Sequence, residues 1–509
     1  MVYFSKILLM VWGMRLLFVL IAAASKLNQF FLLSSFLFVL MVFHACNGVW
    51  CGDFWIHAVV VRELATHPFA PQHPQMLMNA AHAFYSPYTL GVAWLVRIFS
   101  LSPIQALSMA GLFNFLLFMS GLKIFVTLLL GPGRRAFYTL LLTLFLWGQT
   151  PWFFSGFFHF KVLGYVLPYP STFAMALVFY GLSMVILFLR QRSWWMLFAL
   201  YLLSTVVLLT HTLSAVVLYV GFLALAVGCS QEKVMDGVLV LLLVPLSLFL
   251  AMAWPYYSIS QLFMTKGAFI DAENICMYQG VWGSIGPSFI GFWPLFLRIK
   301  SNKRDPLVLM FIALAFIYVY GGITGHYSCG RVISFLVFVL HLAIADWISN
   351  HERFFEQKFI EKSLFLLITG FFILGLFYNC APQARVYWPG IKNSYNQYLF
   401  LGKYTKQYDV ILADLETSDY VPVFGGKVVA YKHSRPFVKD SQERINDVNA
   451  FFDKQASLKE RQAIINKYHV HFILISKEKQ SQGPSVKDFA SLGQAVYVDQ
   501  KFALIKFTP

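Results

Sequence analysis

The chain has 509 residues, of which 59% are hydrophobic, 18% aromatic and only 12% charged. This composition excludes an ordinary soluble protein, because apolar runs of about 20 residues indicate membrane-spanning helices. The formal net charge of +16 does not indicate nucleic-acid binding, because the basic residues lie in short loops and in the C-terminal tail, without a basic helix or an aromatic RNA-binding motif. The six cysteines form no CxxC pair, so neither a zinc site nor a redox motif is indicated.

The first apolar run, at residues 7–24, contains Arg15 and is either a signal-anchor-like helix or a first span. Further apolar runs predict membrane helices at residues 30–46, 106–130, 136–150, 166–189, 194–209, 213–229, 237–254, 282–297, 307–322, 332–348 and 364–378. The predicted fold class is therefore a mostly α, polytopic membrane helical bundle of about eleven or twelve spans, which occupies residues 1–380.

Between the second and third of these runs lies a long loop at residues 48–105, which has helical patches but no full span. Its end, residues 88–100, is amphipathic enough to lie in the membrane interface. We refer to the whole segment at residues 48–105 as the first outer loop.

After residue 380 the chain becomes polar and mixed, and residues 381–509 are predicted to form a small α/β domain. Residues 409–413, 471–476, 494–499 and 502–507 are typical of short strands. Residues 441–454 and 457–468 are typical of helices, each starting at a serine cap. The stretch from Tyr420 to Lys427 is interpreted as a strand that runs into a glycine turn.

The lysines and arginines of the short loops predict the orientation of the bundle, because cytoplasmic loops carry an excess of them. One set of loops holds most of these residues, and we expect it to be cytoplasmic. The other set holds few, and it includes the first outer loop, residues 151–165, 255–281 and 323–330, and the C-terminal domain. The protein is therefore predicted to lie in the inner or plasma membrane with its C-terminal domain extracytoplasmic.

The first carboxylate of the chain, Asp53, directly follows the span at residues 30–46. Gly52 permits a tight bend before it, and a helix-like segment follows, on which Asp53 and His57 would share one face. A carboxylate at the mouth of a membrane helix is costly to desolvate and is therefore a functional candidate. The alternative is a helix N-cap, where Asp is common.

Other candidates are polar residues predicted on the same side of the membrane. Arg331 opens a long apolar run, where its planar guanidinium would suit a lipid-linked phosphate or would simply extend to lipid headgroups. The further candidate substrate contacts are His57, His82, Tyr85, Lys161 and His326. Asp271 and Glu273 form a D-x-E pair that either holds a divalent cation, Mg²⁺ or Mn²⁺, or is a solvated turn.

These residues carry a resemblance. The chain resembles the membrane glycosyltransferases of the GT-C superfamily, which include protein O-mannosyltransferases, aminoarabinose lipid A transferases and oligosaccharyltransferase catalytic subunits. The resemblance rests on Gly52-Asp53-Phe54-Trp55 after a span, on the aromatic-proline element Tyr85-Ser86-Pro87-Tyr88, on the further spans and on the C-terminal domain. Asp53 has no acidic neighbour, whereas an acidic pair is frequent in that loop of the family, so metal use and acceptor class stay open.

The resemblance implies a cell-envelope enzyme that moves a hexose or pentose from a polyprenyl-phosphate or diphosphate donor to a lipid, glycan or protein. Asp53 would be the base of an inverting reaction, and Arg331, Lys161 or a metal would stabilise the leaving phosphate. A transporter or flippase, or a polysaccharide polymerase or ligase, is the alternative. A transporter should carry charges at mid-span, and here only Arg15, Lys123 and Asp346 lie within predicted spans.

Overall fold

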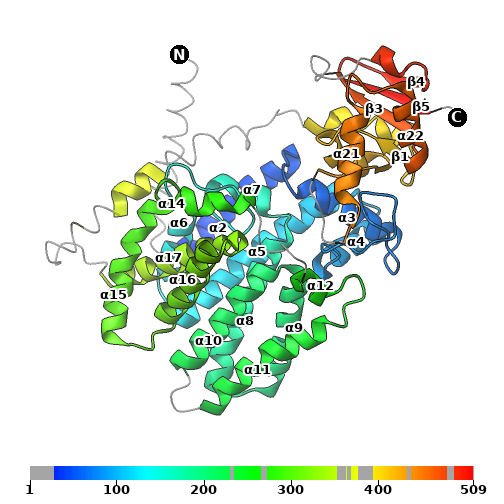
Figure 1. Ribbon diagram of the computed structural model, residues 1–509. Coiled ribbons are helices and arrows are strands. Elements are labelled where there is room, and N and C mark those ends of the chain that lie inside the picture. The colour runs from blue at the N-terminus through cyan, green and yellow to red at the C-terminus, as the bar shows by residue number, and fades with distance from the viewer. Residues whose placement is uncertain are drawn as a thin grey trace, which may run out of the picture. The chain divides into compact units, whose positions relative to one another are not determined.

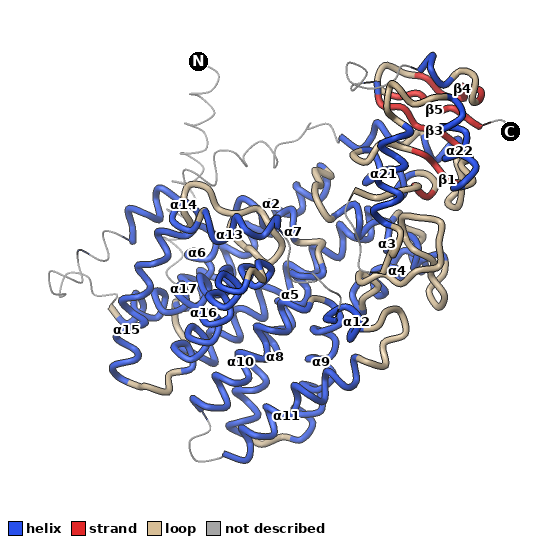
Figure 2. The backbone as a smooth tube through the Cα atoms, in the orientation of Figure 1, coloured by secondary structure: helices blue, strands red, loops and turns tan. Residues whose placement is uncertain are grey.

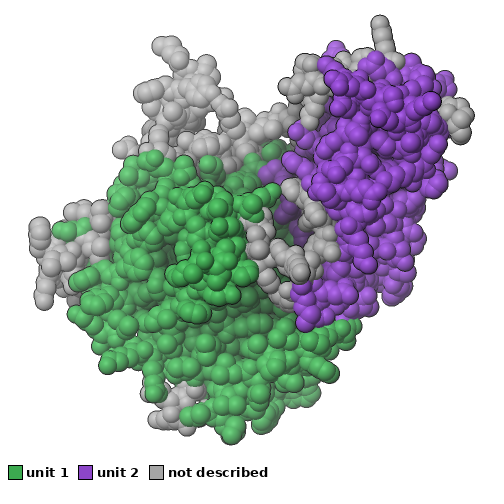
Figure 3. Space-filling view, viewed as in Figure 1, with its two compact units in different colours: residues 1–49, 108–253, 266–391 green, residues 50–107, 254–265, 392–509 purple. Residues whose placement is uncertain are grey.

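The computed structural model of the chain (Figure 1) describes residues 28–229, 234–264, 272–351, 363, 368–375, 394–432, 437–477 and 486–507. Its contacts define two compact units, which Figure 3 colours separately. Unit 1 comprises Met1–Val49, Ser108–Ala253 and Lys266–Ile391, and unit 2 comprises Trp50–Leu107, Trp254–Thr265 and Lys392–Pro509. From Trp50 onward, the first outer loop thus belongs to the same unit as the C-terminal domain. The domain boundary predicted after residue 380 lies outside the described residues and stays a prediction.

Unit 1 is helical, and the strands of the described residues all lie in unit 2 (Figure 2). The long helices of unit 1 are α2 (Gln29–Asn47), α5 (Pro103–Leu130, whose first residues belong to unit 2), α6 (Arg135–Phe145), α8 (Pro170–Gln191), α9 (Trp194–Thr210), α10 (Thr212–Cys229), α11 (Val234–Ala251), α15 (Phe292–Ser301), α16 (Pro306–Thr324) and α17 (Ile333–Asn350). The shorter ones are α7 (Phe160–Val166), η1 (Ala272–Ile275), α13 (Cys276–Gln279), α14 (Val281–Ile285), η2 (Gly286–Gly291) and η3 (Tyr327–Val332).

Seven helices of the described residues are long and apolar enough to cross a membrane: Gln29–Asn47, Pro103–Leu130, Pro170–Gln191, Thr212–Cys229, Val234–Ala251, Pro306–Thr324 and Tyr327–Asn350. They confirm the polytopic helical bundle, and the chain is an integral multi-pass membrane protein. The predicted span at 194–209 is the slightly shorter apolar helix α9. The predicted span at residues 7–24 lies outside the described residues. Within the predicted span at residues 364–378, the structure describes residues 368–375, which are helical.

Two predicted spans, 136–150 and 282–297, are wrong as continuous helices. Helix α6 ends at Phe145, and the second segment is divided among α14, η2 and α15. The backbone N–H of Gly148 donates to the Ser284 carbonyl (2.9 Å), and the N–H of Thr150 donates to the Gly283 carbonyl (3.0 Å). The two irregular segments thus satisfy each other's backbone groups, as non-helical backbone buried within a membrane protein must.

Gly148 and His341 allow these two segments to lie close together and to satisfy their backbone groups. A Cβ on Gly148 would collide with the backbone oxygen of Gly283, so the close approach requires glycine. The buried His341 on α17 places its Nε2 at 3.2 Å from the Leu146 carbonyl oxygen and 3.1 Å from Ser288 Oγ. Ser288 Oγ also donates to the Leu146 carbonyl (2.7 Å). The carbonyl at the end of α6 is therefore hydrogen-bonded although the helix stops there.

The two described charges within predicted spans have structural partners. Asp346, near the end of α17, accepts from Arg135 Nε (2.7 Å) and from Arg298 Nη1 (2.5 Å), and Arg298 also pairs with Asp305 (2.7 Å). The Lys123 ammonium lies 5.8 Å from the ring centroid of Phe30. These contacts give both charges a structural role, so neither charge indicates a pathway for a transported substrate. Arg15 lies outside the described residues.

Unit 2 contains α3 (Phe54–Thr66), α4 (Pro87–Phe99), α12 (Ile259–Met264), η5 (Ser394–Tyr398), α19 (Leu401–Tyr404), η6 (Thr417–Asp419), α20 (Val421–Phe424), α21 (Ser441–Phe451), α22 (Leu458–Tyr468) and η8 (Val486–Phe489). Its strands are β1 (Val410–Leu412), β2 (Lys427–Val428), β3 (Phe472–Ser476), β4 (Gly493–Val498) and β5 (Phe502–Phe507). They form one sheet in the order β2-β1-β3-β5-β4, in which β1 is parallel to β2 and β3, while β5 is antiparallel to β3 and β4. The predicted α/β fold of this region is confirmed.

Strands β1, β3 and β5 are almost fully buried, and their successive side chains point to opposite faces of the sheet. On β3, Ile473 and Ile475 pack into one core with residues of α21 and α22, whereas Phe472 and Leu474 pack into the other with residues of η5 and α19. The two helices are drawn beside the strands in Figure 1. These short apolar strands are therefore central elements of a small two-sided core.

The first outer loop completes this domain. Met76 of the loop forms a parallel bridge with Val428, and the N–H of Val428 donates to the Gln75 carbonyl (2.8 Å). Met76 is also part of the core beneath β1 and β3. The loop therefore adds a short extended segment to the β2 edge, which explains why it folds with residues more than 300 positions later.

Local predictions in this domain had mixed outcomes. Ser457 caps α22 through a reciprocal capping box with Glu460, as predicted. The predicted serine cap of α21 is wrong, because Ser441 is already helical and Asp440 stands before it without a side-chain capping bond. The predicted strand in the stretch beginning at Tyr420 is also wrong. There Pro422 lies in the first turn of the short helix α20, where proline is well suited.

Candidate active site

The surroundings of Asp53 follow from the residues before it. Gly48 ends α2 in the left-handed conformation (φ 61°), and Gly52 turns the chain again (φ 59°), which confirms the predicted bend. The Trp50 ring stacks on Phe54 at 4.5 Å between centroids, with the two planes 8° apart. This stacking fixes the first turn of α3 directly behind Asp53.

Asp53 occupies the N-cap position of α3, but its carboxylate does not cap the helix. The residue is exposed, and its side chain makes no hydrogen bond or ion pair with the residues that the structure describes. A capping Asp would accept from an N–H of the first turn. The cap interpretation therefore loses its physical basis, and the carboxylate is available for another role.

Asp53 and His57 do not share an environment, although they are four residues apart. His57 is 4% exposed, and its ring lies 5.0 Å from the ring of Phe84. Trp55, on another side of the same helix, packs against Tyr395, Tyr420 and Phe424. Helix α3 is therefore buried on nearly all sides, and Asp53 is the polar group at its exposed start.

His82 and Tyr85 belong to the packed interior of the first outer loop. His82 Nδ1 accepts from the Phe84 N–H (3.2 Å), and the Tyr85 hydroxyl donates to the Gln72 carbonyl. Burial, followed by the nearby charge of Glu63, raises the pKa of Tyr85 well above its usual value. Substrate contact by His57, His82 and Tyr85 stays a prediction.

The aromatic-proline element behaves as its sequence indicates. Ser86 is extended (φ −99°, ψ 164°), and Pro87 opens α4, with Ser86 and Thr89 forming a capping box. A residue before proline is biased toward this conformation. The element thus ends the loop at the start of α4.

The sequence did not reveal a buried ion pair inside unit 2. Lys427 Nζ donates to Glu63 Oε2 (2.6 Å) and to the carbonyls of His73 (2.9 Å) and Pro74 (2.8 Å), so all three of its protons are used. Glu63 Oε1 accepts from the Gln72 N–H (3.1 Å) and the Tyr408 hydroxyl (3.3 Å). The two side chains are 3% and 1% exposed. Burial lowers the pKa of Lys427, and the Glu63 carboxylate opposes that shift.

Arg62, next to Glu63, makes a second contact of the same kind. Its Nη1 donates to the carbonyls of Pro422 (2.7 Å) and Gly425 (2.6 Å). Together Arg62 and Glu63 join α3 to α20 and β2. Glu63 is therefore part of the framework that holds α3 in place, and it is a poor alternative to Asp53 as a base.

In unit 1, Arg331 lies on η3, directly before α17. Its Nε donates to Asn274 Oδ1 (3.1 Å), and its guanidinium carbon lies 5.4 Å from the ring centroid of Phe154. Its two terminal nitrogens make no hydrogen bond with described residues. The guanidinium is thus oriented through Nε and an aromatic face, and it keeps the two N–H groups that can bind an oxyanion bidentately.

The remaining candidates of unit 1 differ in how they are held. His326 Nδ1 lies 2.7 Å from Thr324 Oγ1, and its ring stacks on Tyr320. Lys161 lies half-buried in the first turn of α7 and makes no ion pair with a described residue. Their roles as substrate contacts stay predictions.

The structure describes only one of the two carboxylates of the D-x-E pair. Glu273 is exposed on η1, whereas Asp271 lies outside the described residues. Among the described residues no group of three or more His, Cys, Asp or Glu side chains could hold a metal ion. The predicted divalent cation therefore stays untested.

Comparison with solved structures gives the fold. The chain is similar to the archaeal oligosaccharyltransferase AglB from Archaeoglobus fulgidus, solved in complex with an inhibitory peptide and a dolichol-phosphate, with a TM-score of 0.52 and 9% sequence identity over 87% of this chain and 69% of that chain. The chain has a GT-C-like fold. The apo form of the Archaeoglobus fulgidus enzyme gives a TM-score of 0.49 at 8% identity, with the same coverage. No protein-family model matches the sequence, and no curated protein matches it.

Proposed function

We propose that this protein is a membrane glycosyltransferase that moves a sugar from a polyprenyl-phosphate or diphosphate donor to a lipid, glycan or protein acceptor. The observation that carries the proposal is the carboxylate of Asp53, which is exposed and free of capping bonds at the start of α3 in a GT-C-like fold. The solved structure with this fold contains a dolichol-phosphate, which is a polyprenyl phosphate. We place the reaction on the extracytoplasmic face because of the distribution of basic residues.

In this proposal Asp53 takes the proton of the acceptor hydroxyl as the acceptor oxygen attacks the anomeric carbon of the sugar. The bond between that carbon and the phosphate oxygen breaks, and its electron pair leaves with the phosphate. This single displacement inverts the anomeric configuration. One positioned carboxylate suffices as the base. Its exposed position leaves it accessible to an acceptor.

Arg331 is assigned to the leaving phosphate, because its terminal N–H groups match two phosphate oxygens. The contact with Asn274 supports this role, since a guanidinium held through Nε has fewer orientations to lose on binding. Lys161 and His326 are further candidates for contacts to the donor, and the apolar spans would accommodate its polyprenyl tail. No step is assigned to a metal.

The test replaces Asp53 with asparagine and measures sugar transfer from an extract of lipid-linked sugars to membrane acceptors. Asp53→Asn should lower the rate by about 100-fold to 10,000-fold, because it removes a general base, and it should not lower the protein level, because no capping bond is lost. The exposed Asp453, whose Oδ1 accepts from the Gln455 N–H, supplies the control Asp453→Asn, which should transfer at the normal rate. Transfer by Asp53→Asn at the rate of the control would contradict the role of Asp53.

A further inference from the structure

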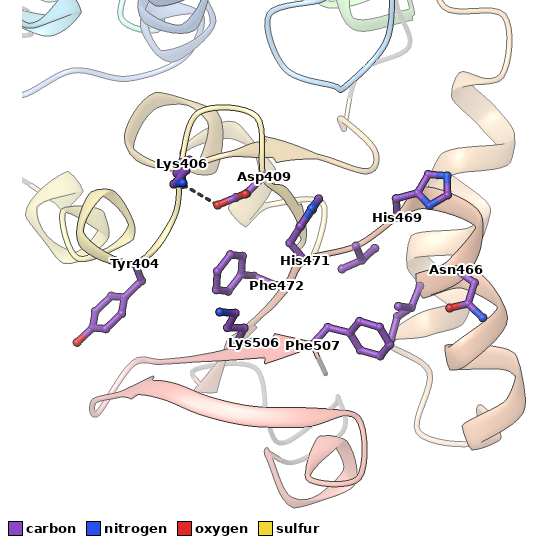
Figure 4. Close-up of a pocket in the computed structure, with 11 residues that line it drawn as sticks. Tyr404, Lys406, Asp409, Asn466, His469, His471, Phe472, Lys506 and Phe507 are labelled. Atoms are coloured by element: carbon purple, nitrogen blue, oxygen red, sulfur yellow. Dashed lines mark hydrogen bonds between the residues drawn. The ribbon is translucent and has the colours of Figure 1, made fainter. Parts of the chain in front are cut away.

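A cavity of about 750 Å³ lies in the C-terminal domain, apart from every residue assigned above. It is bordered by the chain entering β1, by the chain between α22 and β3, and by the end of β5 (Figure 4). Its volume is in the range of small-molecule sites, which is about 300–1,000 Å³. The amino ends of two parallel strands meet here, so the cavity is not the crevice at the carboxyl ends where open α/β sheets usually bind ligands.

The charged groups of the lining are mostly basic. Lys406 and Lys506 contribute two ammonium groups, and neither makes an ion pair with a described residue. The only carboxylate among the lining residues is Asp409, and its Oδ2 accepts from the backbone N–H of Lys406 (2.7 Å). The balance of two lysines against one partly engaged aspartate favours an anionic ligand.

Two histidines border this basic surface, and one of them offers a hydrogen-bond donor. His471 Nδ1 accepts from the Val410 N–H (3.1 Å), so its other ring nitrogen, Nε2, carries the proton and can donate. His469 follows α22 in the left-handed conformation (φ 51°), as the cap of that helix.

The rest of the lining suits a sugar ring. Tyr404, Phe472 and Phe507 contribute aromatic rings, and Asn466 contributes an amide that can both donate and accept. Apolar faces combined with a few polar groups are typical of small-molecule sites. A pyranose presents C–H groups on its faces and hydroxyls at its edge, which matches this combination.

We propose that this cavity binds an anionic saccharide, meaning one or two sugar residues that carry a carboxylate or a phosphate. Lys406 and Lys506 would hold the anion, His471 would donate to it or to a hydroxyl, and the aromatic rings would support the sugar. The choice of a sugar rests on the proposed function, whereas the anionic character rests on the lining alone.

The test measures binding of small probes to the full-length protein in detergent or nanodiscs, by calorimetry. The probes are glucuronic acid, glucose 1-phosphate, glucose and inorganic phosphate. Glucuronic acid or glucose 1-phosphate should bind at least about tenfold more tightly than glucose, because charged hydrogen bonds are stronger than neutral ones. The preferred one of the two identifies the anion as a carboxylate or a phosphate.

The double variant Lys406→Gln/Lys506→Gln should weaken binding of the preferred probe at least about tenfold. The control Lys459→Gln, at an exposed residue of α22 outside the lining, should bind normally. Equal binding of glucose and the anionic sugars, equal binding of inorganic phosphate and glucose 1-phosphate, unchanged binding by the double variant, or no binding of any probe would each overturn the inference. Asp53→Asn should still bind, so failure here is separate from failure of the proposed transfer reaction.

Discussion

The buried pair of Glu63 and Lys427 should hold the first outer loop on the C-terminal domain. Lys427→Met removes the ammonium group while keeping most of the side-chain volume. Glu63 would then keep its bonds from Gln72, Tyr408 and Gln407 but would be a buried carboxylate that has lost the charged group hydrogen-bonded to it. Removing one partner of a buried ion pair typically costs about 3–5 kcal/mol. The loss should appear where the loop meets the sheet.

Hydrogen exchange of the purified protein measures this loss locally. The amide protons of His73 and Val428, which donate to the Met78 and Gln75 carbonyls, should exchange about 100-fold to 4,000-fold faster in Lys427→Met, since each tenfold corresponds to about 1.4 kcal/mol. Glu63→Gln combined with Lys427→Met should recover part of the protection, because no unpaired charge remains.

Lys459→Met, at an exposed lysine of α22, is the control and should leave exchange unchanged. Exchange within about threefold of the wild type in Lys427→Met would refute the reasoning, because it would mean that the pair adds less than about 1 kcal/mol. If Glu63→Gln combined with Lys427→Met exchanges more slowly than Lys427→Met alone, the two charges are energetically coupled.

Three further predictions concern other parts of the chain. Arg331→Lys should impair sugar transfer at normal protein level, because lysine keeps the charge but loses the bidentate geometry; unchanged kinetics would indicate contact with lipid headgroups only. A reporter that is active only in the cytoplasm should be silent when fused after Pro509, and strong activity would reverse the proposed orientation. Gly148→Ala should cost about 1–3 kcal/mol through the collision with the Gly283 backbone, visible as lower thermal stability. Gly91→Ala, where a Cβ meets nothing within 4 Å, should not lower it.

The membrane helices and the C-terminal strands could be predicted because their signals are local. The apolar runs are long enough to span a membrane, and β5 was predicted with the bounds that the structure gives it, Phe502–Phe507. Gly52 and Ser457 each act within a few residues of their own position. Such features need no knowledge of the rest of the fold.

The failures arise where distant segments decide the conformation. Leu146 and Trp147 continue the apolar pattern of α6. The chain nevertheless leaves the helix there, and the N–H groups of Gly148 and Thr150 donate to the carbonyls of Ser284 and Gly283. The apolar stretch Val421–Phe424 is predicted as a strand, but it forms a helical turn whose Pro422 carbonyl accepts from Arg62. The partners Glu63 and Lys427 are 364 residues apart, and nothing near either residue predicts the pair.

The role of Asp53 shows what a structure adds to a correct choice of residue. From the sequence, a base and a helix cap were equally compatible with an Asp at this place. The structure shows an exposed carboxylate without a capping bond, which leaves the catalytic interpretation with the better physical support. The role itself stays a proposal.

Transfer from a lipid-linked donor is tested most directly in cells that lack this protein. Lipids extracted from a deletion strain, and from that strain carrying the wild type, Asp53→Asn or Asp453→Asn, would be compared by mass spectrometry for sugars linked to polyprenyl phosphate or diphosphate. One such lipid-linked sugar should accumulate in the deletion strain and with Asp53→Asn, and it should return to the normal level with the wild type and with Asp453→Asn. An unchanged pool of lipid-linked sugars in the deletion strain would contradict the proposed function.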